Sequence, residues 1–136
     1  MPERTPMTLF SMTTRAMSAQ MVRMNAATSN LANAGSVSST EEGAYRPIRA
    51  VFATELDRAS GLAGVTSSGL VRAETAATKR YDPGHPLANA DGNVFEAPVD
   101  ETSEMVEIME SARQYQNLVQ ALQTAKQLML ETLRSQ

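Results

Sequence analysis

The residues with the greatest capacity for chemistry lie in one turn-rich segment, residues 81–95. His85 is the single histidine of the chain, and Asp82 and Asp91 are close to it in sequence. A histidine beside a carboxylate can act as a general base, so a small hydrolase is one hypothesis. A lone histidine without cysteines matches no metal-ligand spacing, and the chain has no G-x-S-x-G nucleophile motif. We therefore expect His85 to be a turn residue with local hydrogen bonds.

Two further patterns suggest ligand binding only superficially. The oxygen-bearing side chains of this segment would suit calcium: Asp82, Asn89, Asp91 and Asn93. They lack the loop of about twelve residues, with a central glycine and a final glutamate, that calcium-binding hands use. The G-x-x-G at Gly61–Gly64 lacks the following Lys-Ser/Thr of a phosphate-binding loop. The sequence predicts no catalytic residue, no metal and no cofactor.

Composition narrows the class of protein. The chain has 136 residues, of which 42% are hydrophobic and 4% aromatic, and it has no tryptophan and no cysteine. This hydrophobic content excludes wholesale disorder, while the few aromatic residues favour helix packing over a globular enzyme core. The net charge is −3 and basic residues form no patch, so we expect no nucleic-acid partner. No stretch approaches the roughly 20 apolar residues of a membrane span, and the N-terminus does not resemble a secretory signal.

The C-terminal segment, residues 100–136, carries the strongest structural signal. Its apolar positions step by three and four, which is the heptad spacing of a coiled coil. Asp100 is a good N-cap, glutamates follow it, and Arg134 is placed near the helix end. We expect one helix of about 34 residues and about 51 Å. The predicted seam consists of Met105, Ile108, Ala112, Tyr115, Val119, Leu122, Lys126, Met129 and Leu133.

An N-terminal helix within residues 1–34 supplies a partner for this seam. It should begin at Thr5-Pro6 and end at Asn33-Ala34-Gly35, and the first six residues are assigned no function. At about 25 residues it would cover only about 38 Å, so part of the longer helix must contact something else.

Residues 35–99 break the helical periodicity. Residues 45–53 and 70–77 read as strands of a hairpin, with a Gly/Ser-rich tip over residues 58–69. Asp-Pro-Gly at 82–84 and Asp-Gly at 91–92 indicate turns leading to the last helix. The predicted fold is mainly α, with terminal helices pairing as a coiled coil over residues 1–34 and 100–136. A small β-hairpin and extended segment is inserted between them.

Several motifs resemble one protein family. The Ser-Asn-Leu-Ala-Asn-Ala run at residues 29–34 is similar to the N-terminal signature of the bacterial flagellar rod and hook proteins. Residues 81–94, YDPGHPLANADGNV, resemble a segment typical of one proximal rod protein of that family. Residues 104–106, 112–116 and 124–126 resemble its C-terminal helix. Local departures fall at Asn117-Leu118 and Ala97-Pro98.

The resemblance implies a structural, non-enzymatic subunit that polymerises through its terminal helices into the flagellar proximal rod, the drive shaft that transmits torque across the periplasm. Its partners would be copies of itself, other rod proteins and, during secretion without a cleaved signal peptide, the flagellar type III export apparatus. The alternatives are a sister rod protein of the family, or a coiled-coil adaptor or secretion chaperone.

We expect a set of apolar residues to form the assembly and packing surface, with two asparagines fixing the end of the first helix. The apolar and aromatic members are Phe10, Met17, Met24, Leu31, Met105, Ile108, Tyr115, Val119, Leu122, Met129 and Leu133, and the asparagines are Asn30 and Asn33.

Overall fold

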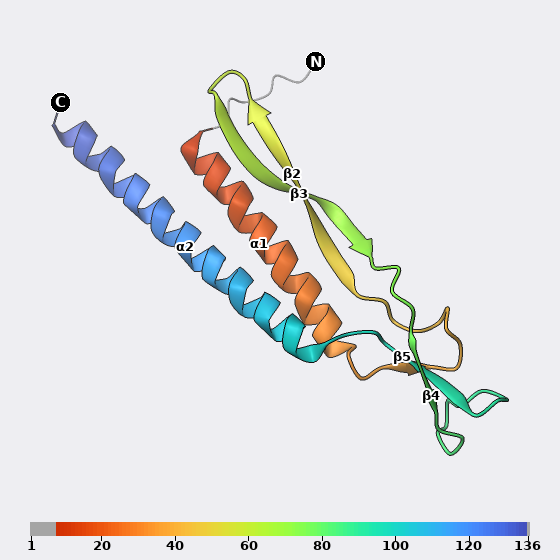
Figure 1. The fold of residues 1–136 in the computed structure, drawn as a ribbon. Coiled ribbons are helices and arrows are strands. Elements are labelled where there is room, and N and C mark those ends of the chain that lie inside the picture. The colour runs from red at the N-terminus through yellow and green to blue at the C-terminus, as the bar shows by residue number, and fades with distance from the viewer. Residues whose placement is uncertain (1–7, 136) are drawn as a thin grey trace.

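The computed structural model describes residues 8–135 and contains two long helices joined by a β region (Figure 1). This confirms a mainly helical fold with an inserted β segment. The elements in chain order are α1 (Leu9–Ala32), β1 (Val37–Ser38), β2 (Ile48–Asp57), β3 (Leu62–Arg72), β4 (Thr78–Tyr81), β5 (Asn93–Glu96) and α2 (Glu101–Arg134).

Helix α1 begins at Leu9 within the described residues. Thr8 is its N-cap, and its hydroxyl accepts a hydrogen bond from the backbone N–H of Ser11 at 3.1 Å. The Ser11 hydroxyl accepts in turn from the Thr8 N–H, so the pair forms a capping box that fixes the first turn at Leu9. The predicted start at Thr5-Pro6 lies outside the described residues. The predicted end is confirmed, because Asn33 is the C-cap.

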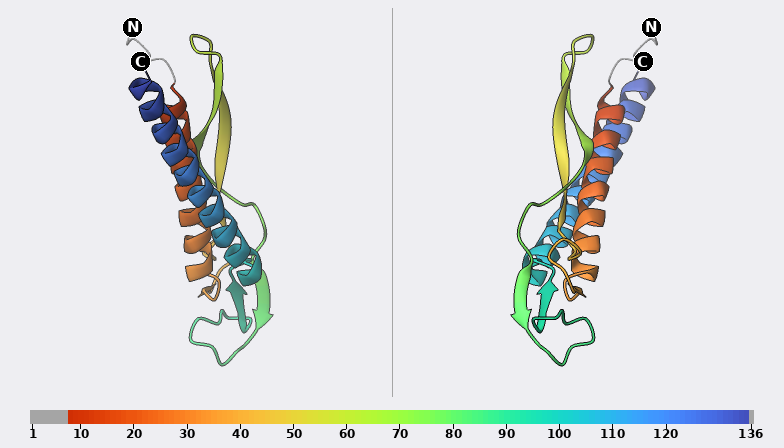
Figure 2. Two further views of the ribbon diagram at one scale, coloured as in Figure 1. Left: turned by 90° about the vertical axis from the view of Figure 1, so that its left-hand side faces the viewer. Right: turned by 90° about the vertical axis from the view of Figure 1, so that its right-hand side faces the viewer.

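Helix α2 has the predicted bounds because its signals are local. The Asp100 carboxylate accepts from the N–H of Thr102 at 3.1 Å, which satisfies one of the free donors of the first turn. The helix then runs for 34 residues to Arg134. It lies antiparallel beside α1, as both figures show (Figures 1 and 2).

The hairpin of β2 and β3 is longer than predicted. Its strands pair from Ile48 opposite Arg72 to Asp57 opposite Leu62, so residues 62–69 belong to a strand rather than to the tip. Packing of β3 against α1 overrides the low strand propensity of its glycines and serines. Gly61, with φ of +73°, makes the short turn. The expectation of a tip over residues 58–69 was therefore wrong.

The hairpin also contains a β-bulge. Val51 lies opposite Gly69 and Phe52 lies opposite Ser67, which leaves Ser68 as an extra residue. Gly69 has φ of +139°, a conformation that side chains disfavour. The Ser68 hydroxyl donates to the Val51 carbonyl oxygen at 3.2 Å and so ties the bulge to the opposite strand.

A second, smaller sheet lies at the other end of the molecule, in the order β1-β5-β4 with antiparallel pairing. The turn-rich residues 82–92 connect β4 to β5. Gly92 allows the ring of Tyr81 to approach closely, since a Cβ there would lie 2.8 Å from that ring.

The elements form three layers, with α1 between α2 and the β2–β3 hairpin (Figures 1 and 2). The buried apolar residues are small: the alanines Ala19, Ala26 and Ala27 in α1, with Ala44, Val94 and Ala97 nearer the small sheet. The accessible surface is 9244 Å². A compact protein of this mass would expose about 6,900 Å². The subunit therefore leaves far more surface uncovered than a globular domain does.

Enlarging a buried alanine should destabilise the layers. Ala27 is fully buried in the middle layer. Ala27→Leu is expected to cost about 1–3 kcal/mol through overpacking. Ala32→Leu is the matched control, because Ala32 is an exposed alanine of the same helix. Thermal unfolding followed by circular dichroism measures both, and equal melting temperatures would contradict the layered packing.

Candidate assembly site

Asn30 fastens the end of α1 to the start of β2. Its side chain is buried, its Nδ2 donates to the Ile48 carbonyl oxygen at 2.9 Å, and its Oδ1 accepts from the Ile48 N–H at 2.8 Å. The Tyr45 hydroxyl also donates to the Asn30 Oδ1 at 2.8 Å and lies 3.1 Å from the Ser29 hydroxyl. One amide thus satisfies both backbone groups of Ile48. We call this set of bonds the Asn30 clamp.

Asn33 has a different role from Asn30. Its Nδ2 donates to the Ser29 carbonyl oxygen at 2.8 Å, which satisfies an acceptor of the last helical turn. Of the two predicted asparagines, Asn33 therefore bonds within the helix end, and Asn30 reaches across to the β region. Sequence reasoning did not identify Ile48 or Tyr45 as the partners of Asn30.

Two arginines connect α2 to the other layers through ion pairs. Glu104 of α2 is 1% exposed, and both of its carboxylate oxygens accept from the guanidinium of Arg49 in β2, the Nη1–Oε2 distance being 2.9 Å. Arg23 of α1 binds Glu107 in the same bidentate way, with 3.0 Å between Nη2 and Oε2, and lies 3.3 Å from Glu110. A buried carboxylate needs such a partner, because desolvation of an unpaired charge is costly.

These contacts shift the pKa values of Glu107, Arg23 and Arg49. The hydrogen bond from Arg23 lowers the pKa of Glu107 below its usual range, against an opposing effect of burial. The bond to Glu107 raises the pKa of Arg23, and the bond to Glu104 raises that of Arg49. The three groups remain charged at neutral pH.

The inner face of α2 differs from the predicted seam by a rotation of the helix. The buried and half-buried positions of α2 are Glu104, Glu107, Ile108, Ser111, Ala112, Tyr115, Leu118, Val119, Leu122 and Ala125. Five predicted seam residues are half-buried, namely Ile108, Ala112, Tyr115, Val119 and Leu122, but Met105 is 50% exposed and Lys126 is exposed. The reason is that Arg49 draws Glu104 inward, a pairing that apolar spacing alone does not indicate. The other predicted members Phe10, Met17, Met24 and Leu31 are half-buried.

The last nine residues of α2 and its C-cap Ser135 are exposed. Residues 126–135, which we call the overhang, are all exposed. The helices have 34 and 24 residues, and the difference corresponds to about 15 Å of helix beyond the end of α1. Four large apolar side chains of the overhang are 45–61% exposed, namely Leu128, Met129, Leu130 and Leu133. The predicted packing residues Met129 and Leu133 are therefore 46% and 61% exposed in the subunit.

The turn-rich segment has the local role expected of it. The Nδ1 atom of His85 accepts from the Leu87 N–H at 3.0 Å, and the backbone N–H of His85 donates to the Asp82 carbonyl oxygen at 3.1 Å. The Asn89 side-chain oxygen accepts from the N–H groups of Asp91 and Asn93 at 3.0 and 2.9 Å. Within residues 8–135, acidic and histidine side chains form no group of three that could hold a metal ion.

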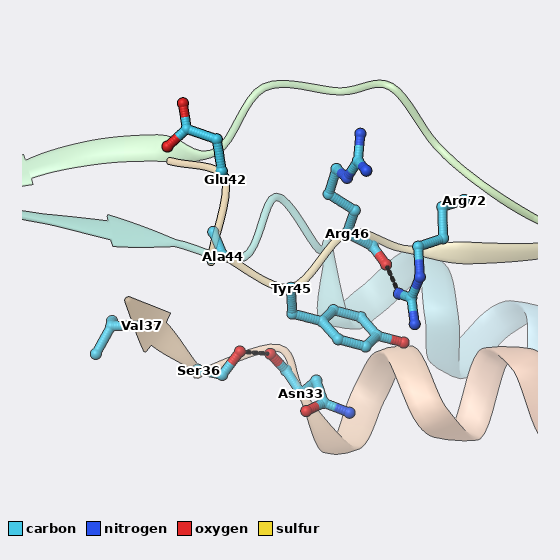
Figure 3. A pocket seen from close by; sticks show the side chains of 9 residues that line it. Asn33, Ser36, Val37, Glu42, Ala44, Tyr45, Arg46 and Arg72 are labelled. Atoms are coloured by element: carbon cyan, nitrogen blue, oxygen red, sulfur yellow. Dashed lines mark hydrogen bonds between the residues drawn. The ribbon is translucent and has the colours of Figure 1, made fainter. Parts of the chain in front are cut away.

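A polar hollow of about 450 Å³ lies beside the clamp (Figure 3). It is bounded by Asn33, the loop before β2, and Arg72. The Arg72 guanidinium lies 5.5 Å from the centroid of the Tyr45 ring and donates to the Arg46 carbonyl oxygen at 3.0 Å. These contacts hold the base of the hairpin, so the hollow is part of the joint between α1 and the β region.

An elongated subunit with polar connections inside and apolar residues uncovered at its helix end belongs to the class of assembling structural proteins. Neither helix of the described part is long and apolar enough to cross a membrane.

Comparison with known proteins identifies the family. Residues 91–135 match the family model of the flagellar basal body rod FlgEFG protein C-terminal region. The flagellar basal-body rod protein FlgC of Salmonella typhimurium is 37% identical over 92% of this chain and 93% of its own length. The corresponding protein of Escherichia coli O157:H7 is 38% identical over the same shares, and that of Agrobacterium fabrum is 32% identical over 84% and 83%. The chain belongs to the FlgC family of flagellar basal-body rod proteins, and it is a structural subunit of the flagellar rod.

Removing the Asn30 side-chain amide should loosen the hairpin. Asn30→Ala leaves the backbone groups of Ile48 without their partner, and each unsatisfied buried group costs about 1–3 kcal/mol. Asn25→Ala is the control, because Asn25 is exposed on the same helix. Hydrogen exchange of the Ile48 amide should accelerate in the first variant only. Unchanged protection would contradict the clamp.

Acid should weaken the helix pair through Glu107. The pKa of Glu107 is lowered in the folded state and returns to about 4.3 in the unfolded chain. Its contribution to stability is thus present above about pH 4.3 and is lost as the pH falls through the lower folded-state pKa. Urea unfolding across this range should show less pH dependence in Glu107→Gln than in Glu101→Gln, which changes an exposed acid of the same helix. Identical profiles for the two variants would exclude the Arg23–Glu107 linkage.

Proposed function

We propose that the subunit polymerises through its terminal helices, and that the overhang of α2 is the element that makes polymerisation favourable. The observation that carries the proposal is the exposure of all ten overhang residues together with their four large apolar side chains. Covering such side chains contributes about 25 cal/mol for each Å² of apolar surface removed from water. A neighbouring subunit is the natural source of that cover.

The contact is heterologous, since the overhang of one copy meets a different surface on the next. A heterologous contact that does not close into a ring generates an open helical filament. The heptad spacing of α2 suits supercoiling with the helices of neighbours, and this coiled coil would extend the pairing with α1 beyond the end of α1. The product is a rod that transmits torque.

The partners we propose are copies of this chain and other rod proteins of the proximal rod. The relatives are named as basal-body rod proteins, which supports a place in the rod as it crosses the periplasm. The absence of cysteine suits export through the flagellar type III apparatus without a cleaved signal peptide, because an unfolded chain then forms no disulfides. The role is structural and non-enzymatic.

A charge in the overhang should stop assembly without unfolding the subunit. Leu133 is 61% exposed, so Leu133→Asp should change the stability of the isolated chain by less than about 0.5 kcal/mol. In the rod it would bury an unpaired carboxylate, and swimming should be lost. The measurements are circular dichroism of the purified chain and swimming of cells that carry the variant as their only copy.

Gln127→Asp provides the control for this prediction. It adds the same charge at an exposed polar position of the overhang, and swimming should persist. Normal swimming with Leu133→Asp would disprove assembly through the overhang. Loss of helix content in that variant would show instead that Leu133 stabilises the subunit itself.

A further inference from the structure

The sheet of β2 and β3 has two faces of different character. Toward the tip, the register places Asp57 opposite Leu62, Glu55 opposite Gly64, and Ala53 opposite Thr66 on one face. This face lies toward the helices, because Gly64 is buried and Glu55 binds Arg15 of α1 at 2.8 Å. The side chains at alternate positions must point away from α1.

This second face carries no charge. Its cross-strand pairs are Leu56 opposite Ala63, Thr54 opposite Val65, Phe52 opposite Ser67 and, beyond the bulge, Ala50 opposite Leu70. We call these eight residues the outer face. Its four largest side chains, Phe52, Leu56, Val65 and Leu70, are 40–60% exposed. Every charged residue of the two strands outside the outer face either faces the helices or lies at an end of the hairpin.

Because the outer face is uncharged and exposes four large apolar side chains, we expect another surface to bind it. Singly scattered apolar side chains are ordinary on protein surfaces, but a contiguous group without charge marks an interaction site. The strands have ten and eleven residues, which corresponds to a platform about 33 Å long. A sheet face of this length suits a helix lying along it, as α1 already lies along the inner face (Figure 2).

We propose that the outer face binds the overhang of α2 from a second copy of the chain. All ten residues of the overhang are exposed in the described chain, and its exposed apolar residues match an uncharged surface. It cannot be covered in this way within its own subunit, because the outer face points away from the helices and α2 packs on the far side of α1. This inference deepens the proposed polymerisation, on which it rests, by naming the surface that receives the overhang.

Each copy then both supplies an overhang and offers an outer face. The two surfaces lie on opposite sides of the middle layer, so one copy can be engaged by two neighbours at once. This arrangement makes the contact directional, and every added copy presents the next outer face.

The chain contains no cysteine, which allows a disulfide test without background. One copy carries Leu56→Cys on the outer face, and a second copy with a tag of different mass carries Leu133→Cys in the overhang. Both are expressed together in cells whose swimming they restore, and isolated basal bodies are oxidised. A disulfide of mixed mass is expected, because it forms only where the two Cβ atoms approach to about 4 Å. Placing the cysteines in separate chains excludes bonds within one subunit.

Ala53→Cys is the matched control for Leu56→Cys. Ala53 is exposed on the same strand, but its side chain lies on the face of the sheet that points toward the helices. Ala53→Cys should therefore give no mixed disulfide with Leu133→Cys. The pair Val65→Cys and Leu130→Cys provides a second test of the same contact and replaces the first if that pair does not restore swimming.

The alternatives give different products. A disulfide between two Leu56→Cys copies would show that outer faces bind each other, and one between two Leu133→Cys copies would show that overhangs pair. Either result without the mixed product, or oxidised basal bodies that contain the chain without any disulfide, overturns the proposed contact. If the chain were absent from basal bodies, the proposed polymerisation itself would fail.

Discussion

The bidentate bond between Arg49 and Glu104 determines how the three layers fit together. Glu104 is the largest side chain fully removed from water, and Arg49 of β2 holds both of its oxygens. The rotation of α2 that buries Glu104 also decides which of its apolar residues face α1 and which face outward. Without that pair, the apolar spacing alone would permit the neighbouring face of α2 to turn inward.

The subunit buries mostly small and polar residues and exposes many of its large apolar residues. Alanines, an asparagine, a serine and a glutamate occupy buried positions where a globular domain has leucine and phenylalanine. Several larger apolar side chains lie instead in the overhang and in the outer face, where they are available to neighbours. Hydrogen bonds and ion pairs thus orient the elements, and apolar surface is reserved for association. We infer that the subunit gains much of its stability only in the rod.

Sequence reasoning succeeded where structure depends on local signals. The Asp100 and Asn33 caps and the turns around His85 involve neighbours within four residues, and their spacing is visible in the sequence. It failed where a distant residue decides the outcome. Asn30 binds Ile48, 18 residues away, and Glu104 binds Arg49, 55 residues away. The glycines and serines before Leu70 read as a loop because the helix that supports them as a strand is not a neighbour in sequence.

The extra residue Ser68 determines which face of the hairpin each side chain of β3 points to. Side chains alternate along a strand, so a shift of one residue exchanges the two faces. Between Leu62 and Ser67, the side chains of Ala63, Val65 and Ser67 point outward only because Ser68 is accommodated in the bulge. Loss of that single residue would turn Val65 inward and Thr66 outward if the base of the hairpin kept its pairing. The number of residues in β3, as well as their chemistry, therefore determines which side chains form the outer face.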